Sequence, residues 1–211
     1  MLESIDEAAT MGAPRKNCFP LPADITSQEQ ITEAVRIIDR TTPWLNGMVN
    51  SAALPQRRQF QWPLAEESSA FWHNILDTNL LGSWLVTISA LPLMLRSSAV
   101  RVLFLSSEAG WANTAGFGQY NVSKAALNSL GSSLAEECVR RYPDADVQIN
   151  IVVPGEARTE MNQGSDNSPY TLASMALLLL SHPAGGPNGK FFHRDGRHLE
   201  FAYSAPYAIP L

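Results

Sequence analysis

The stretch VRVLFLSSEAGWANTAGFGQYNVSK, residues 100–124, joins a strand-like run to the beginning of a helix. Its first six residues, Val100–Leu105, are rich in β-branched and aromatic side chains and run into serines, which is typical of a buried strand. Tyr120 and Lys124 stand four residues apart, so a helix places the phenol and the ammonium on one face. The chain has only three lysines and five tyrosines. The position of the Tyr120–Lys124 pair shortly after Ser107 is therefore poorly explained by chance.

Composition places the chain among ordinary globular proteins. Its 211 residues, 45% hydrophobic and 17% charged, suit a single domain, which we expect to span residues 1–211. A net charge of −5 with interspersed signs argues against nucleic-acid binding. The two cysteines, Cys18 and Cys138, lie far apart, which favours a reducing compartment over disulfides or zinc. The longest apolar run, residues 175–180, is too short to cross a membrane, and residues 1–14 do not resemble a signal peptide. We expect a cytoplasmic protein.

Strand-like and helical patterns alternate along the chain. Strands are predicted at 18–23, 47–51, Val100–Leu105, Val147–Val153 and 189–193. Helices are predicted at 27–41, 66–77, 78–96, 119–141 and 169–180. The first helix has a capping box at Ser27 and Gln30, with Ile31, Val35 and Ile38 as its buried stripe. This alternation indicates an α/β protein in which helices cover both faces of a mostly parallel sheet, a three-layer sandwich.

Taken together, these residues resemble the short-chain dehydrogenase/reductase family, whose Rossmann fold moves hydride between NAD or NADP and alcohols or carbonyls. The resemblance runs from about residue 24 to residue 196, which leaves 197–211 as a C-terminal tail. It implies a catalytic set of Asn79, Ser107, Tyr120 and Lys124. It also implies NAD or NADP as the cofactor and a small alcohol or carbonyl as the substrate.

Each catalytic residue type fits its implied role. Tyr120 would be the general acid/base at the substrate oxygen, although an ordinary phenol titrates near ~10. Lys124 would favour the phenolate by its charge and hydrogen-bond the nicotinamide ribose. Ser107 would hydrogen-bond the substrate oxygen, and Asn79 would hold a water that links Lys124 to solvent. Open α/β sheets bind ligands at the carboxyl ends of their strands, where Ser107 is predicted to lie.

The resemblance extends to cofactor contacts. Asp24 matches an aspartate that contacts the adenine ring, with a plain turn residue as the alternative. Asn50 and Ala52 lie in Asn-Ser-Ala-Ala, where the family has Asn-Asn-Ala-Gly, so only two of four positions match. Asn50 alternatively serves as a hydrogen-bonding group at a strand end. The residues that match the segment beside the nicotinamide are Pro154, Gly155 and Thr159, with Tyr120 and Lys124 shared between catalysis and cofactor binding.

Several residues keep two interpretations. Trp111 either lines the substrate pocket, with Ser107 and Tyr120, or belongs to the core. The polar segment 156–168 is either a substrate loop or a plain surface loop. His193 and His198 flank an Asp-Gly turn typical of a hairpin, and we interpret both as exposed strand residues that bind no metal.

A glycine-rich phosphate loop is missing from the sequence. The family begins with a strand, a Thr-Gly-x-x-x-Gly-x-Gly turn and a helix, because the backbone must approach the pyrophosphate closely. Here Gly12 is the only glycine before Gly47. In the family's strand order 3-2-1-4-5-6-7, the strand at 18–23 would lose both neighbours and the strand at 47–51 would lose one. The chain is a shortened form of a longer enzyme, re-pairs these strands, or has its edge covered by a partner.

Two functions follow from these observations. The intact catalytic set indicates an NAD(P)-dependent dehydrogenase or reductase. The missing loop favours the alternative, an inactive relative that acts as a binding or oligomerising subunit. In the family, the helices matching 78–96 and 119–141 pack against a second subunit, so a homodimer or tetramer is expected either way. A serine hydrolase is disfavoured because no Gly-x-Ser-x-Gly motif surrounds Ser107.

Overall fold

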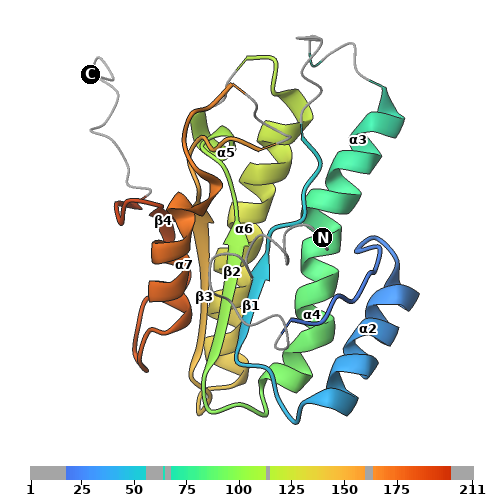
Figure 1. The fold of residues 1–211 in the computed structure, drawn as a ribbon, viewed down its shortest axis with the longest axis vertical. Helices are drawn as coiled ribbons and strands as arrows, with labels where there is room; N and C mark the ends of the chain where they lie inside the picture. Colours follow the sequence, from blue (N-terminus) through green and yellow to red (C-terminus); the bar gives the residue numbers. More distant parts are fainter. Residues whose placement is uncertain (1–17, 56–63, 65–67, 113–114, 160–163, 201–211) are drawn as a thin grey trace, which may run out of the picture.

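A five-stranded sheet forms the centre of the protein. The computed structural model describes residues 18–55, 64, 68–112, 115–159 and 164–200 (Figure 1). The strands, in sheet order, are β1 (Gly47–Asn50), β2 (Val100–Leu105), β3 (Val147–Val153), β4 (Phe191–His193) and β5 (His198–Leu199). The first four are parallel, and β5 pairs antiparallel with β4. The predicted α/β class with a mostly parallel sheet is confirmed.

Helices connect these strands. They are α2 (Gln28–Thr41), α3 (Ser69–Leu76), η3 (Asp77–Gly82), α4 (Ser83–Met94), α5 (Ala109–Ala112), α6 (Gly118–Arg141), η4 (Pro169–Leu172) and α7 (Ala173–Leu180). Ser27 caps α2 by accepting a hydrogen bond from the backbone N–H of Gln30, as the capping box predicts. None of the helices in the described part of the chain has the length and apolar character that a bilayer crossing requires.

The prediction of two separate helices at 66–77 and 78–96 was wrong. The segments α3, η3 and α4 follow each other without a break, and η3 is a π-helical turn. No glycine or proline interrupts the sequence at residues 77–78, so nothing there ends a helix. The irregularity instead widens the helix around Asn79. Such π turns often mark functional positions.

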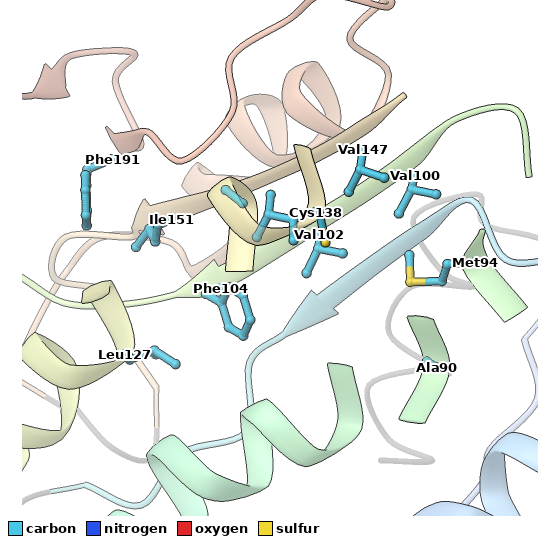
Figure 2. Packing of buried hydrophobic residues seen from close by; sticks show 12 residues of the cluster. Ala90, Met94, Val100, Val102, Phe104, Leu127, Cys138, Val147, Ile151 and Phe191 are labelled. Atoms are coloured by element: carbon cyan, nitrogen blue, oxygen red, sulfur yellow. The ribbon is translucent and has the colours of Figure 1, made fainter. Parts of the chain in front are cut away.

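Side-chain alternation along β2 and β3 sends apolar residues to two helical layers. Val102 and Phe104 face one cluster, to which α4 contributes Met94 and α6 contributes Leu127 (Figure 2). The residue between them, Leu103, joins a second cluster on the other face of the sheet, formed with α7. Figure 1 shows α7 on the opposite side of the sheet from α4 and α6. The three layers therefore follow from the two-residue period of the strands.

The predicted strand at 18–23 was wrong. Residues 18–24 have no strand hydrogen bonding in the structure. Pro20 and Pro22 remove two backbone donors, and none of the described strands pairs with the segment. Strand β1 consequently has β2 as its one neighbour among the described residues. Val49 of β1 is 42% exposed, so the edge stays open rather than re-paired within the described chain.

The hairpin predicted at Asp195 and Gly196 is confirmed. Gly196 has φ of 88°, a conformation that glycine adopts without a steric penalty. The turn brings β5 back along β4, so Phe191 pairs with Leu199. Polar side chains fix the preceding segment: Arg101 donates to the carbonyl of His182 at 2.7 Å and forms an ion pair with Asp146. These contacts attach the residue that follows α7 and the residue before β3 to strand β2.

Helix α6 approaches the sheet closely at Gly131. A Cβ atom there would lie 2.8 Å from Cδ1 of Ile151 and 3.3 Å from the ring of Phe104. Both neighbours are fully buried, so they have little space into which to move.

Replacing Gly131 by valine should therefore lower the free energy of unfolding by about 1–3 kcal/mol through overpacking. The matched control is Ser133→Val, which puts the same side chain at an exposed position of the same helix. Chemical denaturation measures both. Equal stability of the two variants would contradict the close approach of α6 to the sheet.

Candidate active site

The predicted catalytic residues gather at the carboxyl end of the sheet. Ser107 lies two residues beyond β2, and Pro154 directly follows β3. Tyr120 and Lys124 occupy the first two turns of α6. Because α6 begins close to where β2 ends, the tyrosine and the lysine are brought back over the serine.

The Ser107 hydroxyl lies close enough to the Tyr120 phenol to act on its pKa. Tyr120 is otherwise buried, and the ring of Phe117 packs beside it at 6.3 Å between centroids. Burial raises the pKa of Tyr120 above its ordinary value, and the Ser107 hydroxyl lowers it by a smaller amount. Tyr120 therefore holds its proton at neutral pH.

Lys124 is the buried cation of the site. It is 3% exposed, and its Nζ lies 5.6 Å from the centre of the Tyr120 ring. The ammonium donates a hydrogen bond of 2.8 Å to the carbonyl oxygen of Leu105, the last residue of β2. Burial lowers the pKa of Lys124 to about 8.

Asn79 joins three parts of the site. It is fully buried in the π turn η3. Its Oδ1 accepts from the backbone N–H of Leu54 at 2.7 Å, and its Nδ2 donates to the Leu54 carbonyl and to Ser123 Oγ, both at 3.1 Å. These bonds tie the segment after β1 to helix α6. Sequence reasoning missed Ser123, although it lies inside the Tyr-x-x-x-Lys motif.

The residues predicted to bind the cofactor before α3, which are Asn50, Ala52 and Asp24, differ in their surroundings. Asn50 ends β1 and donates to Thr87 Oγ1 at 3.0 Å, a partner that sequence reasoning did not find. Ala52 is exposed in the following segment. The carboxylate of Asp24 accepts hydrogen bonds from the backbone and the hydroxyl of Thr26, at 2.9 and 2.8 Å. The backbone bond, followed by the hydroxyl bond, lowers the pKa of Asp24.

The segment after β3 is closely packed at its start. Gly155 has φ of 64°, and a Cβ atom there would lie 3.2 Å from both His193 and Arg194. The backbone N–H of Arg158 donates to the carbonyl of Asn167 at 2.8 Å, which closes the base of the predicted substrate loop. Thr159 is exposed. The positive φ gives Gly155 a specific structural reason to be glycine.

The interpretation of His193 as an exposed strand residue was wrong. Its side chain is only 15% exposed, with Nδ1 2.8 Å from Asp195 Oδ1 and Nε2 3.9 Å from Glu108 Oε1. The side chain is covered because the hairpin folds against the segment after β2. His198 is exposed, as predicted. No three metal-ligating side chains come together anywhere in the described ranges.

Trp111 lies in α5, directly after the serine exit of β2, and is half-buried. Its position next to Ser107 in the fold fits a pocket wall and a core residue equally. Residues 201–211 of the expected C-terminal tail lie outside the described residues.

Comparison with known proteins identifies the family. The family model described as short chain dehydrogenase matches residues 3–169. The chain therefore belongs to the short-chain dehydrogenase family.

Individual relatives agree with that assignment. A 3-oxoacyl-[acyl-carrier-protein] reductase from Aquifex aeolicus is 28% identical over 189 residues, which cover 82% of this chain and 73% of the relative. The 11-beta-hydroxysteroid dehydrogenase 1A of Arabidopsis thaliana is 34% identical over 167 residues, 77% of this chain and 44% of the relative. The chain thus spans less than half of that plant protein.

Solved structures show the same fold. A short chain dehydrogenase from Salmonella enterica serovar Typhi has a TM-score of 0.73 at 25% identity, covering 82% of this chain and 72% of the other. A structure from Escherichia coli CFT073, complexed with NADPH, has a TM-score of 0.72 at 25% identity and the same coverage. The Rossmann-type architecture that the resemblance implied is confirmed.

The buried ammonium of Lys124 makes a testable contribution to stability. Its folded pKa of about 8 lies below the ordinary value of 10.5, so between these values the unfolded chain binds more protons than the folded one. Stability from this group consequently rises with pH across that window. The variant Lys124→Met lacks the effect. Its stability relative to wild type should therefore fall by about 1–3 kcal/mol as the pH rises from ~7 to ~10.

Denaturant unfolding of both proteins at the two pH values measures this difference, and comparison with wild type cancels the groups that both proteins share. Lys190→Met, which removes an exposed lysine, is the control. A stability difference that does not change with pH would show that Lys124 titrates normally.

Proposed function

We propose that this chain is an NAD(P)-dependent oxidoreductase that transfers hydride between the nicotinamide cofactor and an alcohol or carbonyl substrate. The observation that carries the proposal is the hydroxyl pair of Ser107 and Tyr120 beside the Lys124 ammonium. Two neighbouring hydroxyls can both turn to a substrate oxygen placed between them. The family membership of the chain supports the same activity.

In this function Tyr120 delivers the proton. Its Oη donates to the carbonyl oxygen of the substrate as that oxygen gains negative charge, while the Ser107 hydroxyl hydrogen-bonds the same oxygen. The Lys124 charge then stabilises the phenolate that remains. The nicotinamide, when bound, supplies or accepts the hydride. In the oxidation direction, the phenolate takes the proton of the alcohol.

The residues present fit the nicotinamide end of the cofactor. An ammonium has three N–H donors, and the Leu105 carbonyl takes one of those on Lys124. The others can hydrogen-bond ribose hydroxyls. Asn50 and Ala52 after β1, with Pro154, Gly155 and Thr159 after β3, would border the remainder, and Asp24 would contact the adenine. The described residues contain no glycine-rich turn for the pyrophosphate, so we expect weak cofactor binding.

Titration of the purified chain with NADH and NADPH, followed by calorimetry, tests the cofactor proposal. We expect saturable binding in the micromolar-to-millimolar range, because Lys124 and Asn50 are present to bind the nicotinamide end while the described residues contain no glycine-rich turn for the phosphates. No binding at millimolar cofactor would contradict the function for this chain.

The substitution Tyr120→Phe removes the proton donor and keeps the ring. Carbonyl reduction should fall by at least about 100-fold, the usual size of a general-acid effect, while cofactor affinity changes little. The control is Tyr142→Phe, because Tyr142 lies beyond the far end of α6. Retained turnover in Tyr120→Phe would remove Tyr120 from its assigned role.

The state of the two titrating groups predicts the pH profile. Since Tyr120 is protonated at neutral pH and Lys124 loses its charge near about 8, carbonyl reduction should be constant at neutral pH and decline above about 8. Initial rates at saturating cofactor across this range provide the measurement. A reduction rate that increases with pH would show that Tyr120 is not the proton donor.

A second function rests on the open sheet edge. Strand β1 has one neighbour among the described strands, and Val49 and Trp44 near it are about half exposed. A chain that binds no cofactor would fit the role of a binding or oligomerising subunit. The cofactor titration separates the two functions.

Either function is compatible with a homodimer or tetramer. Apolar side chains are exposed on the helices that the resemblance assigns to subunit packing: Leu81, Trp84, Val122 and Val139. Covering them against a second copy would stabilise the assembly. The variant Trp84→Glu should shift the mass measured by light scattering toward the monomer. Leu177→Glu, exposed on the other layer, is the control.

A further inference from the structure

Three consecutive residues at the exit of β2 each face a different residue of α6. The carbonyl of Leu105 accepts from Lys124, the hydroxyl of Ser106 donates to Oδ1 of Asn128, and the hydroxyl of Ser107 acts on the phenol of Tyr120. The three α6 residues stand at intervals of four, so they share one face of the helix. Two of these ties belong to the site described above. The tie between Ser106 and Asn128 does not.

The pair of Ser106 and Asn128 is buried, with each residue 4% exposed. The neighbouring helix α5 packs against the same place, because a Cβ atom on Gly110 would lie 2.6 Å from Nδ2 of Asn128. The backbone N–H of Gly110 in turn donates to the carbonyl of Ser107 at 3.0 Å. Asn128 is therefore held by Ser106 at its Oδ1 and covered by Gly110 at its Nδ2, which makes no hydrogen bond within the described residues, so it has little space in which to shift.

We infer that Asn128 and Ser106 are positioning residues for the active site. Their hydrogen bond sets the spacing between the exit of β2 and α6, and thereby holds the Ser107 hydroxyl at the Tyr120 hydroxyl. The inference deepens the proposed function and rests on it where turnover is concerned. Neither residue touches the reacting atoms, so both act through Ser107.

The local geometry explains why such a tie is needed. Ser106 makes the last backbone contact with the sheet, through its N–H to the carbonyl of Val152 at 2.9 Å. Ser107 follows it outside the strand, where its Oγ accepts one further bond, from the backbone N–H of Ala109 at 3.2 Å. An error of about 1 Å in the position of a catalytic group lowers rates strongly. The Ser106 side chain supplies the nearest rigid attachment to α6.

A double-substitution cycle separates positioning from stability. The variants are Ser106→Ala, Asn128→Leu and the two combined. Each single substitution leaves a buried polar group without its partner and should lower stability. The combined variant replaces both partners by apolar groups, so its stability should recover toward that of wild type. The control is Ser132→Ala, which removes a hydrogen bond to the Gly189 carbonyl one turn further along the same face.

The positioning role predicts that activity does not recover with stability. All three variants should show kcat lowered by about 10-fold with KM changed less than about 3-fold, while Ser132→Ala stays near wild type. Recovery of kcat in the combined variant, together with its stability, would overturn the inference and leave a purely structural pair.

Ionisation of Tyr120 tests the same inference without turnover. The phenolate absorbance of each protein, minus that of its Tyr120→Phe counterpart, gives the pH at which Tyr120 ionises. We expect this pH to be higher in the combined variant than in wild type, because a displaced Ser107 hydroxyl no longer favours the phenolate. An unchanged ionisation pH would overturn the positioning role. Since this measurement needs no cofactor, it decides the inference even if the chain binds none.

Discussion

The buried ammonium of Lys124 is the feature on which the geometry of the site depends. A charge in the interior is unfavourable unless polar groups surround it, and here the Leu105 carbonyl at the end of β2 provides that contact at 2.8 Å. The hydrogen bond holds the first turns of α6 against the exit of β2. Because Tyr120 lies one turn before Lys124 on the same face, the same contact fixes the phenol beside Ser107.

Burying charged and polar groups in this way lowers the stability of the folded chain, but it places those groups where the chemistry requires them. Burial lowers the pKa of Lys124 to about 8 and raises that of Tyr120, so the ammonium and the phenolate are both less stable here than they would be in water. The supporting contacts of Asn79 and Asn128 are also buried and polar. Apolar residues would pack there with less desolvation, which indicates that these side chains serve the alignment of the site and not the core alone.

The main elements of the fold were predictable because their patterns are local. Val100–Leu105 and Val147–Val153 have buried, β-branched sequences, and they form β2 and β3 with the predicted bounds. Residues 18–23 have a similar apolar character but form no strand, because a strand exists only with a neighbour to pair with. The break predicted at residues 77–78 failed for another reason: a π turn leaves almost no signal in sequence.

By itself the sequence determined the family and the identities of the candidate catalytic groups, because the spacing of Tyr120 and Lys124 on one helix face is a local property of the chain. It also showed that residues 1–46 contain a single glycine, Gly12. Only the tertiary structure decided how Asn79, Asn128 and His193 are used, and which pKa values are shifted. Those properties depend on burial and on partners from distant segments, which come together only when the helices pack on the sheet.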